Sequence, residues 1–363
     1  MNSTQETTTG QEESRPSFED LVIGHTRLVD TLTRVMSLIR NPCGTSMALL
    51  FGATAVGKTT LLQRLLRKHN DQYSNLIQQD QSVIPSFYVE VPAPDNSKMN
   101  WRDLNIRALE KLNEPHLDKK GAEVNYVGIN SADVRRKLEK TIKNRRATLA
   151  IYDEAQHFTK VTGAKSSQQQ QDYIKSLANL SGTFIVLSGT YDLLELLPRS
   201  GQLARRMLPI HLARYRADIP NDWRAFREVV LTFQQALPFP ENATLMEFVE
   251  FLYHGSLGCV GLLKCWLNRA SALANESGSQ QITLEHLTAT MLPKPALDRI
   301  EKEIREGETK SADYDAPADV FRKIMKSKES TVGPEADHEE VKRKKWPVGQ
   351  RKPHRDPVGI ENA

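Results

Sequence analysis

This sequence of 363 residues has few cysteines, no long apolar run and only a small excess of one charge. No apolar run reaches the roughly 18 residues that a membrane-spanning helix needs, so we expect no transmembrane segment and no membrane partner. Residues 1–20 are polar and acidic and lack the basic and apolar regions of a signal peptide, which favours a cytoplasmic protein. The three cysteines, Cys43, Cys259 and Cys265, have no zinc-finger spacing, and their odd number argues against a disulfide framework.

Positive charge gathers near the C-terminus, although the net charge of the whole chain is only +4. Residues 341–355, VKRKKWPVGQRKPHR, hold seven Lys or Arg and no Asp or Glu. Such a run is typical of a solvated tail, of a segment that contacts DNA phosphates without reading bases, or of a docking peptide that orders around Trp346 on binding. The sequence leaves these three interpretations open.

Strand-like and helix-like segments alternate through the first 220 residues. Apolar runs predict five strands, at 47–52, 82–93, 148–158, 183–190 and 208–212. Helical spacing of apolar residues predicts helices before and between them, at 21–39, 58–69, 101–112, 131–145 and 172–182. This alternation predicts an α/β fold with a parallel five-stranded sheet covered by helices. From about Trp223 the pattern is wholly helical, which indicates a second, smaller domain.

Residues 52–59, GATAVGKT, match the pattern G-x-x-x-x-G-K-[ST] between an expected strand and an expected helix. The glycines allow backbone N–H groups to wrap the phosphates of ATP at the positive end of the following helix. Lys58 is expected to reach the β- and γ-phosphates, and the Thr59 hydroxyl to ligate Mg²⁺. The residues expected to bind the nucleotide here are Gly52, Ala53, Thr54, Ala55, Val56, Gly57, Lys58, Thr59 and Thr60.

Two adjacent acids, Asp153 and Glu154, follow the third apolar run, about 95 residues after the P-loop. Asp153 is expected to hold the magnesium ion through water, and Glu154 to polarise the water that attacks the γ-phosphate. Hydrolysis at such a site depends on positioning and on neutralising the charge of the transferred phosphoryl group.

Two further elements are expected beside the γ-phosphate. The fourth strand ends in Ser188-Gly189-Thr190, where a polar side chain would orient the lytic water; Ser188 is the first candidate and Thr190 the second. For both, a turn or helix-capping role is the alternative. Arg205 and Arg206 lie just before the last strand, where an arginine would reach the phosphate of a neighbouring subunit. A surface arginine or a local salt bridge is the alternative for both residues.

The order of these elements resembles the AAA+ superfamily: a P-loop, an acidic motif, a polar strand end, an arginine before the fifth strand and a helical lid. Within that superfamily the chain is similar to the TnsC/TniB type, the ATPase regulators of heteromeric, Tn-seven-like DNA transposition systems. Four stretches carry this likeness: 88–115 (YVEVPAPDNSKMNWRDLNIRALEKLNEP), 149–158 (LAIYDEAQHF), 185–212 (from IVLSGTYDLLELL to GQLARRMLPIHL) and 351–359 (RKPHRDPVG).

The resemblance implies ATP-dependent assembly of a homo-oligomer, a ring or helical filament, on duplex DNA in a bacterial cytoplasm. This oligomer would join a target-selecting protein to transposase subunits, and the basic tail is the expected docking segment for the transposase. By position, Lys98, Lys119 and Lys120 are the candidates for DNA contact, and a solvated loop is the alternative for each. The resemblance also places Val22 and Ile23 near the adenine of ATP.

The chain departs from the resembled family at one position in the lid. The family's lid arginine ends a G-x-x-R string, but here the string is Gly258-Cys-Val-Gly261. Lys264, one turn later, is the candidate substitute; the alternative is a lid that does not sense the γ-phosphate.

Four parts of the chain follow from these observations. They are a disordered N-terminus at 1–16, an AAA+ nucleotide-binding α/β domain at 17–220, a helical lid domain at 221–305, and a mostly disordered basic tail at 306–363 that docks partners.

Other classes of P-loop protein fit the sequence less well. Residues 153–157, DEAQH, resemble a helicase box, but a helicase needs a second RecA-like domain and the chain after residue 220 has a helical pattern. A small-molecule kinase would normally lack the helical lid. A slowly hydrolysing signalling or scaffold ATPase differs from the main hypothesis only in turnover. A DNA loader of the replication-initiator or clamp-loader type is the nearest alternative, although no winged-helix pattern follows the lid.

Overall fold

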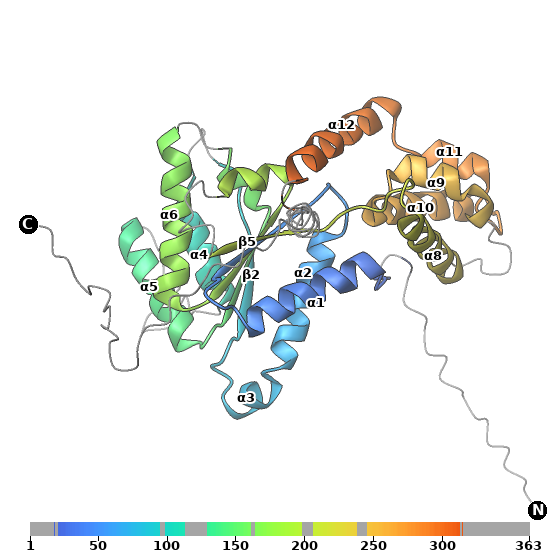
Figure 1. Ribbon diagram of the computed structural model, residues 1–363. Helices are drawn as coiled ribbons and strands as arrows, with labels where there is room; N and C mark the ends of the chain where they lie inside the picture. The colour runs from blue at the N-terminus through green and yellow to red at the C-terminus, as the bar shows by residue number, and fades with distance from the viewer. Residues whose placement is uncertain are drawn as a thin grey trace, which may run out of the picture. The chain divides into compact units, whose positions relative to one another are not determined.

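A sheet of five parallel strands, in the order β2-β3-β4-β1-β5, organises the first part of the chain (Figure 1). The computed structural model describes residues 18, 21–94, 99–112, 129–160, 164–197, 206–237, 245–312 and 314. The strands are β1 (Met47–Phe51), β2 (Ser86–Glu90), β3 (Leu149–Asp153), β4 (Phe184–Gly189) and β5 (Met207–His211). The predicted parallel five-stranded sheet is therefore confirmed.

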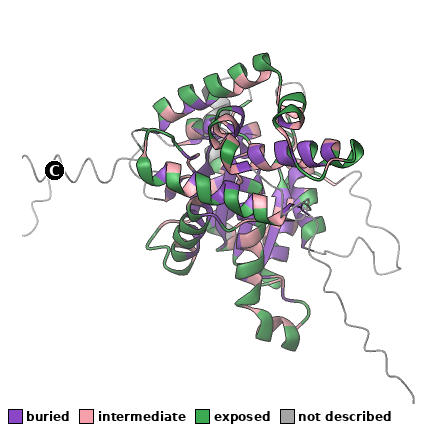
Figure 2. Ribbon diagram, turned by 90° about the vertical axis from the view of Figure 1, so that its right-hand side faces the viewer, coloured by how far each residue is buried: buried purple, intermediate pink, exposed green. Residues whose placement is uncertain are grey.

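Helices cover both faces of this sheet. The covering helices are α1 (Thr26–Arg40), α2 (Lys58–Asp71), α4 (Trp101–Lys111), α5 (Ser131–Asn144) and α6 (Ala164–Ser181), and the short α3 (Ser74–Gln79) follows α2. Helix α1 packs on α2, whereas α5 packs between α4 and α6 in a separate layer. Because both faces are covered, every residue of β1, β3 and β4 is buried, which explains their continuous apolar runs (Figure 2).

The strand order places a ligand site at the carboxyl end of β1. The chain passes from β1 to the edge strand β2, returns through β3 to β4, and ends with β5 on the other side of β1. In open α/β sheets, ligands bind outside the carboxyl ends of the strands where the strand order reverses. The P-loop follows β1 at this point, and Asp153 ends the second strand over, β3.

The lid helices form a second hydrophobic core. They are α8 (Pro220–Ala236), α9 (Val249–Ser256), α10 (Val260–Glu276) and α11 (Leu284–Thr290), with the short 3₁₀ turn η3 (Leu245–Phe248) before α9. Trp266 is buried in this core, and its indole N–H donates a 2.9 Å hydrogen bond to the carbonyl of Leu287. The ring lies so close to α9 that a Cβ on Gly255 would be 2.3 Å from it.

The last described helix, α12 (Lys294–Ser311), packs on the α/β domain rather than on the lid core. Ile304 is buried in the main core, and a Cβ on Gly307 would lie 2.1 Å from the ring of Tyr191 in the 3₁₀ turn η2 (Tyr191–Leu196). Glu308 forms an ion pair with Arg214 at 2.8 Å. The expected boundary at residue 305 therefore falls inside a helix, because the packing contacts of α12 continue through Gly307.

Several predicted segments lie outside the described residues, namely 1–16 and, apart from Tyr314, everything after Ala312. In the part of the chain that the structure describes, no helix has the length and apolar character needed to cross a membrane.

Candidate active site

The P-loop joins the end of β1 to the start of α2, and two of its positions require glycine. Gly57, the residue before α2, has a φ of +111°, which is strained for residues with a side chain. Gly52 has an ordinary backbone angle, but a Cβ there would lie 2.4 Å from the carbonyl oxygen of Leu212, just after β5. The strand-to-helix turn is therefore compact, and the amide groups in the first turn of α2 are free of helical partners and could bind the phosphates of a nucleotide.

Lys58 is buried under this loop. Its ammonium donates hydrogen bonds to the carbonyl oxygens of Gly52, at 3.0 Å, and Ala53, at 2.7 Å. Burial lowers the pKa of Lys58, and the carboxylates of Glu154 and Asp153 act in the opposite direction. A phosphate of ATP would offer this cation stronger acceptors than the two neutral carbonyls.

The carboxylate of Asp153, at the end of β3, accepts three hydrogen bonds. Its Oδ2 accepts from the hydroxyl of Thr59, at 2.8 Å, and from the hydroxyl of Tyr88, at 2.9 Å. Its Oδ1 accepts from the backbone N–H of Glu154 at 3.0 Å. The structure thus brings together Thr59 and Asp153, the two residues expected to hold Mg²⁺. A hydroxyl beside a carboxylate fits magnesium, which prefers oxygen ligands and keeps several waters.

Tyr88 is a residue of the site that the sequence did not reveal. Its hydroxyl reaches Asp153 because β2 and β3 are neighbours, with Glu90 opposite Asp153 in their register. Burial raises the pKa of Tyr88, and the negative charge of Asp153 raises it further, so the phenol remains a donor. No local signal identifies this residue, because strand neighbours depend on the global sheet order.

Glu154 is held in an unusual backbone conformation, with φ +54° and ψ +30°. The conformation turns the chain directly from β3 into the 3₁₀ turn η1 (Ala155–Phe158). The carboxylate accepts a hydrogen bond from the side-chain amide of Gln156. Positive φ in a residue with a Cβ costs energy and is concentrated at functional sites.

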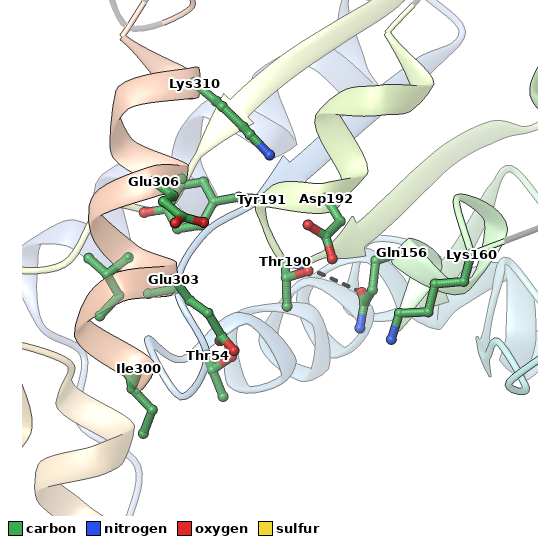
Figure 3. Close-up of a pocket in the computed structure, with 13 residues that line it drawn as sticks. Thr54, Gln156, Lys160, Thr190, Tyr191, Asp192, Ile300, Glu303, Glu306 and Lys310 are labelled. Carbon is green, nitrogen blue, oxygen red and sulfur yellow. Dashed lines mark hydrogen bonds between the residues drawn. The ribbon is translucent and has the colours of Figure 1, made fainter. Parts of the chain in front are cut away.

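Two cavities lie against the P-loop. The larger, of about 260 Å³, is lined on one side by Thr54, Gln156 and Thr190, and on the other by Glu303 and further residues of α12 (Figure 3). The smaller, of about 60 Å³, has mainly apolar walls from the N-terminal segment, the P-loop and the lid. Val22 and Ile23, predicted near adenine, line the smaller cavity together with Phe233.

The structure distinguishes the two candidates for orienting the lytic water. Ser188 is fully buried one residue before the end of β4, and within the described chain its hydroxyl has no hydrogen-bond partner. It does not line the larger cavity, whereas Thr190, just past the strand, does. Of the two candidates, Thr190 alone lines the larger cavity, and the orientation of the lytic water by Ser188 or Thr190 stays a prediction.

Arg206 lies at the opposite end of the strands from the P-loop. It directly precedes β5, and its guanidinium donates a 2.8 Å hydrogen bond to Asn179. Since the P-loop follows the carboxyl end of neighbouring β1, this arginine is separated from its own site by the length of a strand. Arg205 and the three candidates for DNA contact, Lys98, Lys119 and Lys120, lie outside the described residues.

The lid touches the P-loop directly. A Cβ on Gly261, the second residue of α10, would lie 2.4 Å from the carbonyl oxygen of Ala55. Lys264, the candidate substitute for the missing lid arginine, lines the smaller cavity rather than the larger one. Lys264 therefore shares a cavity with Val22 and Ile23.

The N-terminal segment is fastened to the lid. Arg27 makes two hydrogen bonds of 2.7 Å to the carboxylate of Asp222 in α8. The His25 ring and the Tyr215 hydroxyl form a 3.0 Å hydrogen bond. Burial, and secondarily the charge of Arg64, lowers the pKa of His25 to about 4. These contacts hold Val22 and Ile23, which line the smaller cavity, beside the lid.

Comparison with known proteins agrees with this architecture. A family model described as an AAA domain matches residues 43–197. Among solved structures, the chain is similar to the Aeropyrum pernix ORC1 protein, solved in complex with DNA, with a TM-score of 0.53 and 17% identity over 74% of this chain and 65% of that one. It is also similar to A. pernix ORC2, in its ADPNP and ADP complexes, with a TM-score of 0.50 and 13% identity over 77% of this chain and 70% of that one.

A third similar structure is CDC6P of Pyrobaculum aerophilum, with a TM-score of 0.50 and 15% identity over 78% of this chain and 69% of that one. No curated protein matches the sequence. The match spans slightly less than two thirds of the ORC1 chain. Together with the P-loop and the sheet order, these likenesses define the fold as that of an AAA+ P-loop ATPase.

Proposed function

We propose that this protein is an ATP-dependent regulator of DNA transposition, of the TnsC/TniB type. It binds ATP and Mg²⁺, assembles as an oligomer on duplex DNA, and links a target-selecting protein to transposase subunits. Hydrolysis of ATP controls assembly and disassembly. The nucleotide lies across the P-loop, with its base in the smaller cavity and its γ-phosphate toward the larger one.

One observation carries the nucleotide part of this proposal. The hydroxyl of Thr59 and the carboxylate of Asp153 lie 2.8 Å apart, beside a buried Lys58 and directly before Glu154. This is the set of groups that an ATP–Mg²⁺ complex needs: a phosphate-binding cation, two oxygen ligands and a carboxylate for the attacking water.

The position of Arg206 supports assembly. An arginine at the far end of the strands from its own P-loop can contribute to hydrolysis only at the site of another subunit. A charged arginine at the transferred phosphoryl group accelerates hydrolysis by about a thousandfold or more in other P-loop enzymes. In this proposal, Arg205 or Arg206 of a neighbouring subunit completes each nucleotide site, so rapid turnover requires oligomerisation.

A DNA-bound ATPase of the replication-initiator type is the second candidate. It is favoured by the structural likeness to the ORC1, ORC2 and CDC6P structures, the first of which is a complex with DNA. The four TnsC-like stretches favour the transposition regulator. The two candidates share the site and differ in the partner protein.

Imaging by electron microscopy tests the proposal. The full chain is mixed with duplex DNA and with ATP, ADP or a non-hydrolysable ATP analogue. We expect oligomers on DNA with the analogue and few with ADP; monomers under every nucleotide condition would refute assembly. A pull-down with the transposase separates the candidates: a chain lacking residues 340–363 should hydrolyse ATP normally and lose transposase binding. Failure of the intact chain to bind any transposase subunit would favour the initiator.

A further inference from the structure

Gln156 lines the larger cavity and forms hydrogen bonds to residues that follow two different strands. It is buried in η1, two residues after Glu154. Its amide nitrogen donates to the carboxylate of Glu154. Its amide oxygen accepts from the backbone N–H of Thr190 at 3.2 Å, as Figure 3 shows. One side chain thus connects the end of β3 with the end of β4.

The surroundings of Gln156 are built to fit it. A Cβ on Gly189, the last residue of β4, would lie 2.3 Å from the amide oxygen of Gln156 and 3.0 Å from its backbone nitrogen. Gly189 is therefore a glycine because Gln156 occupies the space beside it. The turn that carries Gln156 is fixed as well, since the buried Phe158 stacks on Trp101 with ring centroids 5.4 Å apart.

The hydrogen bonds also fix which way the amide faces. The N–H of Thr190 can only donate, so the amide oxygen of Gln156 faces it and the amide NH₂ must face Glu154. A carboxylate can only accept, and therefore this orientation satisfies both partners. Replacing Gln156 with glutamate would keep the shape of the side chain but exchange the donor for a second negative oxygen.

We propose that Gln156 is a positioning residue for hydrolysis: it sets the direction of the Glu154 carboxylate and couples it to Thr190 at the γ-phosphate side of the site. This inference rests on the ATPase activity proposed above. Gln156 and Thr190 both line the larger cavity, and a hydrogen bond joins them. A ligand in this cavity that displaces Thr190 would therefore also displace the Gln156 amide and, through it, the Glu154 carboxylate. The placement of the Glu154 carboxylate then depends on the end of β4, which faces the γ-phosphate in the proposed function.

The substitution Gln156→Glu tests the role of the donor without changing side-chain size. At neutral pH we expect kcat for ATP to fall on the order of 10- to 100-fold, because small misplacement of a catalytic group has effects of this size. The KM for ATP should stay within about twofold, since Gln156 does not touch the P-loop lysine. Gln281→Glu, an exposed site in the lid with the same charge change, should behave as the wild type.

The pH dependence separates positioning from packing. When the carboxylate that Gln156→Glu introduces is protonated, it supplies an O–H donor again, so the ratio of variant to wild-type kcat should rise as the pH is lowered. A ratio of one at every pH, or a reduced ratio that does not change with pH, would overturn the inference. Loss of ATP binding in Gln156→Glu would do the same.

Amide hydrogen exchange gives a second readout that does not require turnover. In Gln156→Ala the N–H of Thr190 loses its acceptor, so its exchange should accelerate while the buried amides of β1 keep their protection. Unchanged exchange at Thr190 would remove the coupling part of the inference. If the wild type itself hydrolyses no ATP under any condition, the proposed ATPase activity fails and this inference fails with it; a hydrolysing wild type with an unaffected Gln156→Glu variant overturns the inference alone.

Discussion

Gly261 of α10 lies against the carbonyl oxygen of Ala55 so closely that a Cβ would be 2.4 Å away. The neighbouring atom belongs to the backbone of the P-loop and has little freedom to yield. Gly261→Ala should therefore displace α10 from the P-loop and weaken ATP binding severalfold, as measured by isothermal titration calorimetry. Cys265→Ala, on the exposed side of the same helix, is the control. Unchanged affinity in Gly261→Ala would mean that the lid does not contribute to the bound state.

Tyr88→Phe should weaken the response to magnesium. The substitution removes one donor from Asp153 Oδ2 and keeps the ring in place. Groups that orient metal ligands commonly contribute about tenfold or more to metal affinity. We expect the Mg²⁺ concentration for half-maximal hydrolysis to rise about tenfold, with little change in ATP binding without metal. Tyr73→Phe removes a hydroxyl outside the site and should have no effect on the Mg²⁺ titration.

Glu154→Gln should separate binding from turnover. The amide cannot polarise the attacking water, so kcat is expected to fall by about 10²- to 10⁴-fold. ATP affinity should remain within about twofold, and oligomers on DNA should persist because they no longer lose their ATP. Glu110→Gln, on the exposed surface of α4, provides the matched control. A hydrolysis rate equal to that of the wild type would exclude Glu154 from the proposed role.

Arg206→Ala should leave ATP binding by the isolated subunit intact and reduce assembly-dependent hydrolysis by about a thousandfold. Mixing provides a sharper measurement. Glu154→Gln subunits keep Arg206, whereas Arg206→Ala subunits keep Glu154, so mixed oligomers contain some complete sites. Hydrolysis should recover on mixing, and no recovery would contradict action on a neighbouring subunit. Arg34→Ala, on the exposed surface of α1, should match the wild type.

The buried His25 predicts acid sensitivity of the lid attachment. Its pKa in the folded protein is about 4, below the value of roughly 6.5 in an unfolded chain. As the pH is lowered, His25 is therefore protonated in the unfolded state before it is protonated in the folded state. The contribution of neutral His25 to stability is complete above about pH 6.5 and declines as the pH falls toward 4, by a total on the order of 3 kcal/mol.

Denaturant unfolding at several pH values measures this effect. The His25→Gln variant cannot titrate, so the stability difference between wild type and variant should shrink as the pH is lowered through this range. Carboxylates elsewhere titrate in both proteins and cancel in the comparison. A difference that stays constant with pH would show that His25 is already protonated or is not buried.

The sheet and the centre of the site were predictable because their signals are local. The apolar run of β1, the glycines of the P-loop and the acids after β3 each follow from a short segment. Parallel strands end at a common edge, which brings Thr59 and Asp153 together as expected. Tyr88 could not be predicted in this way, since its partner depends on β2 lying next to β3.

Other differences have the same non-local origin. Ser188 and Thr190 are both small polar residues of one short segment. Ser188 lies within β4 and is buried, whereas Thr190 lies just past the end of the strand and lines the larger cavity. The contact of α12 with Tyr191 joins segments about a hundred residues or more apart along the chain. Gly261 was interpreted as a missing arginine, whereas the packing of α10 on Ala55 gives the glycine a steric reason.

The double hydrogen bond between Arg27 and Asp222 has a practical consequence for chimeric proteins. Residues 21–27 precede the sheet in the chain, yet they bind α8 through Arg27 and line the smaller cavity together with the lid. A lid grafted without these residues would lack one side of the smaller cavity. The unit of exchange between related ATPases is therefore discontinuous, and a functional swap should transfer the N-terminal segment together with residues 220–291.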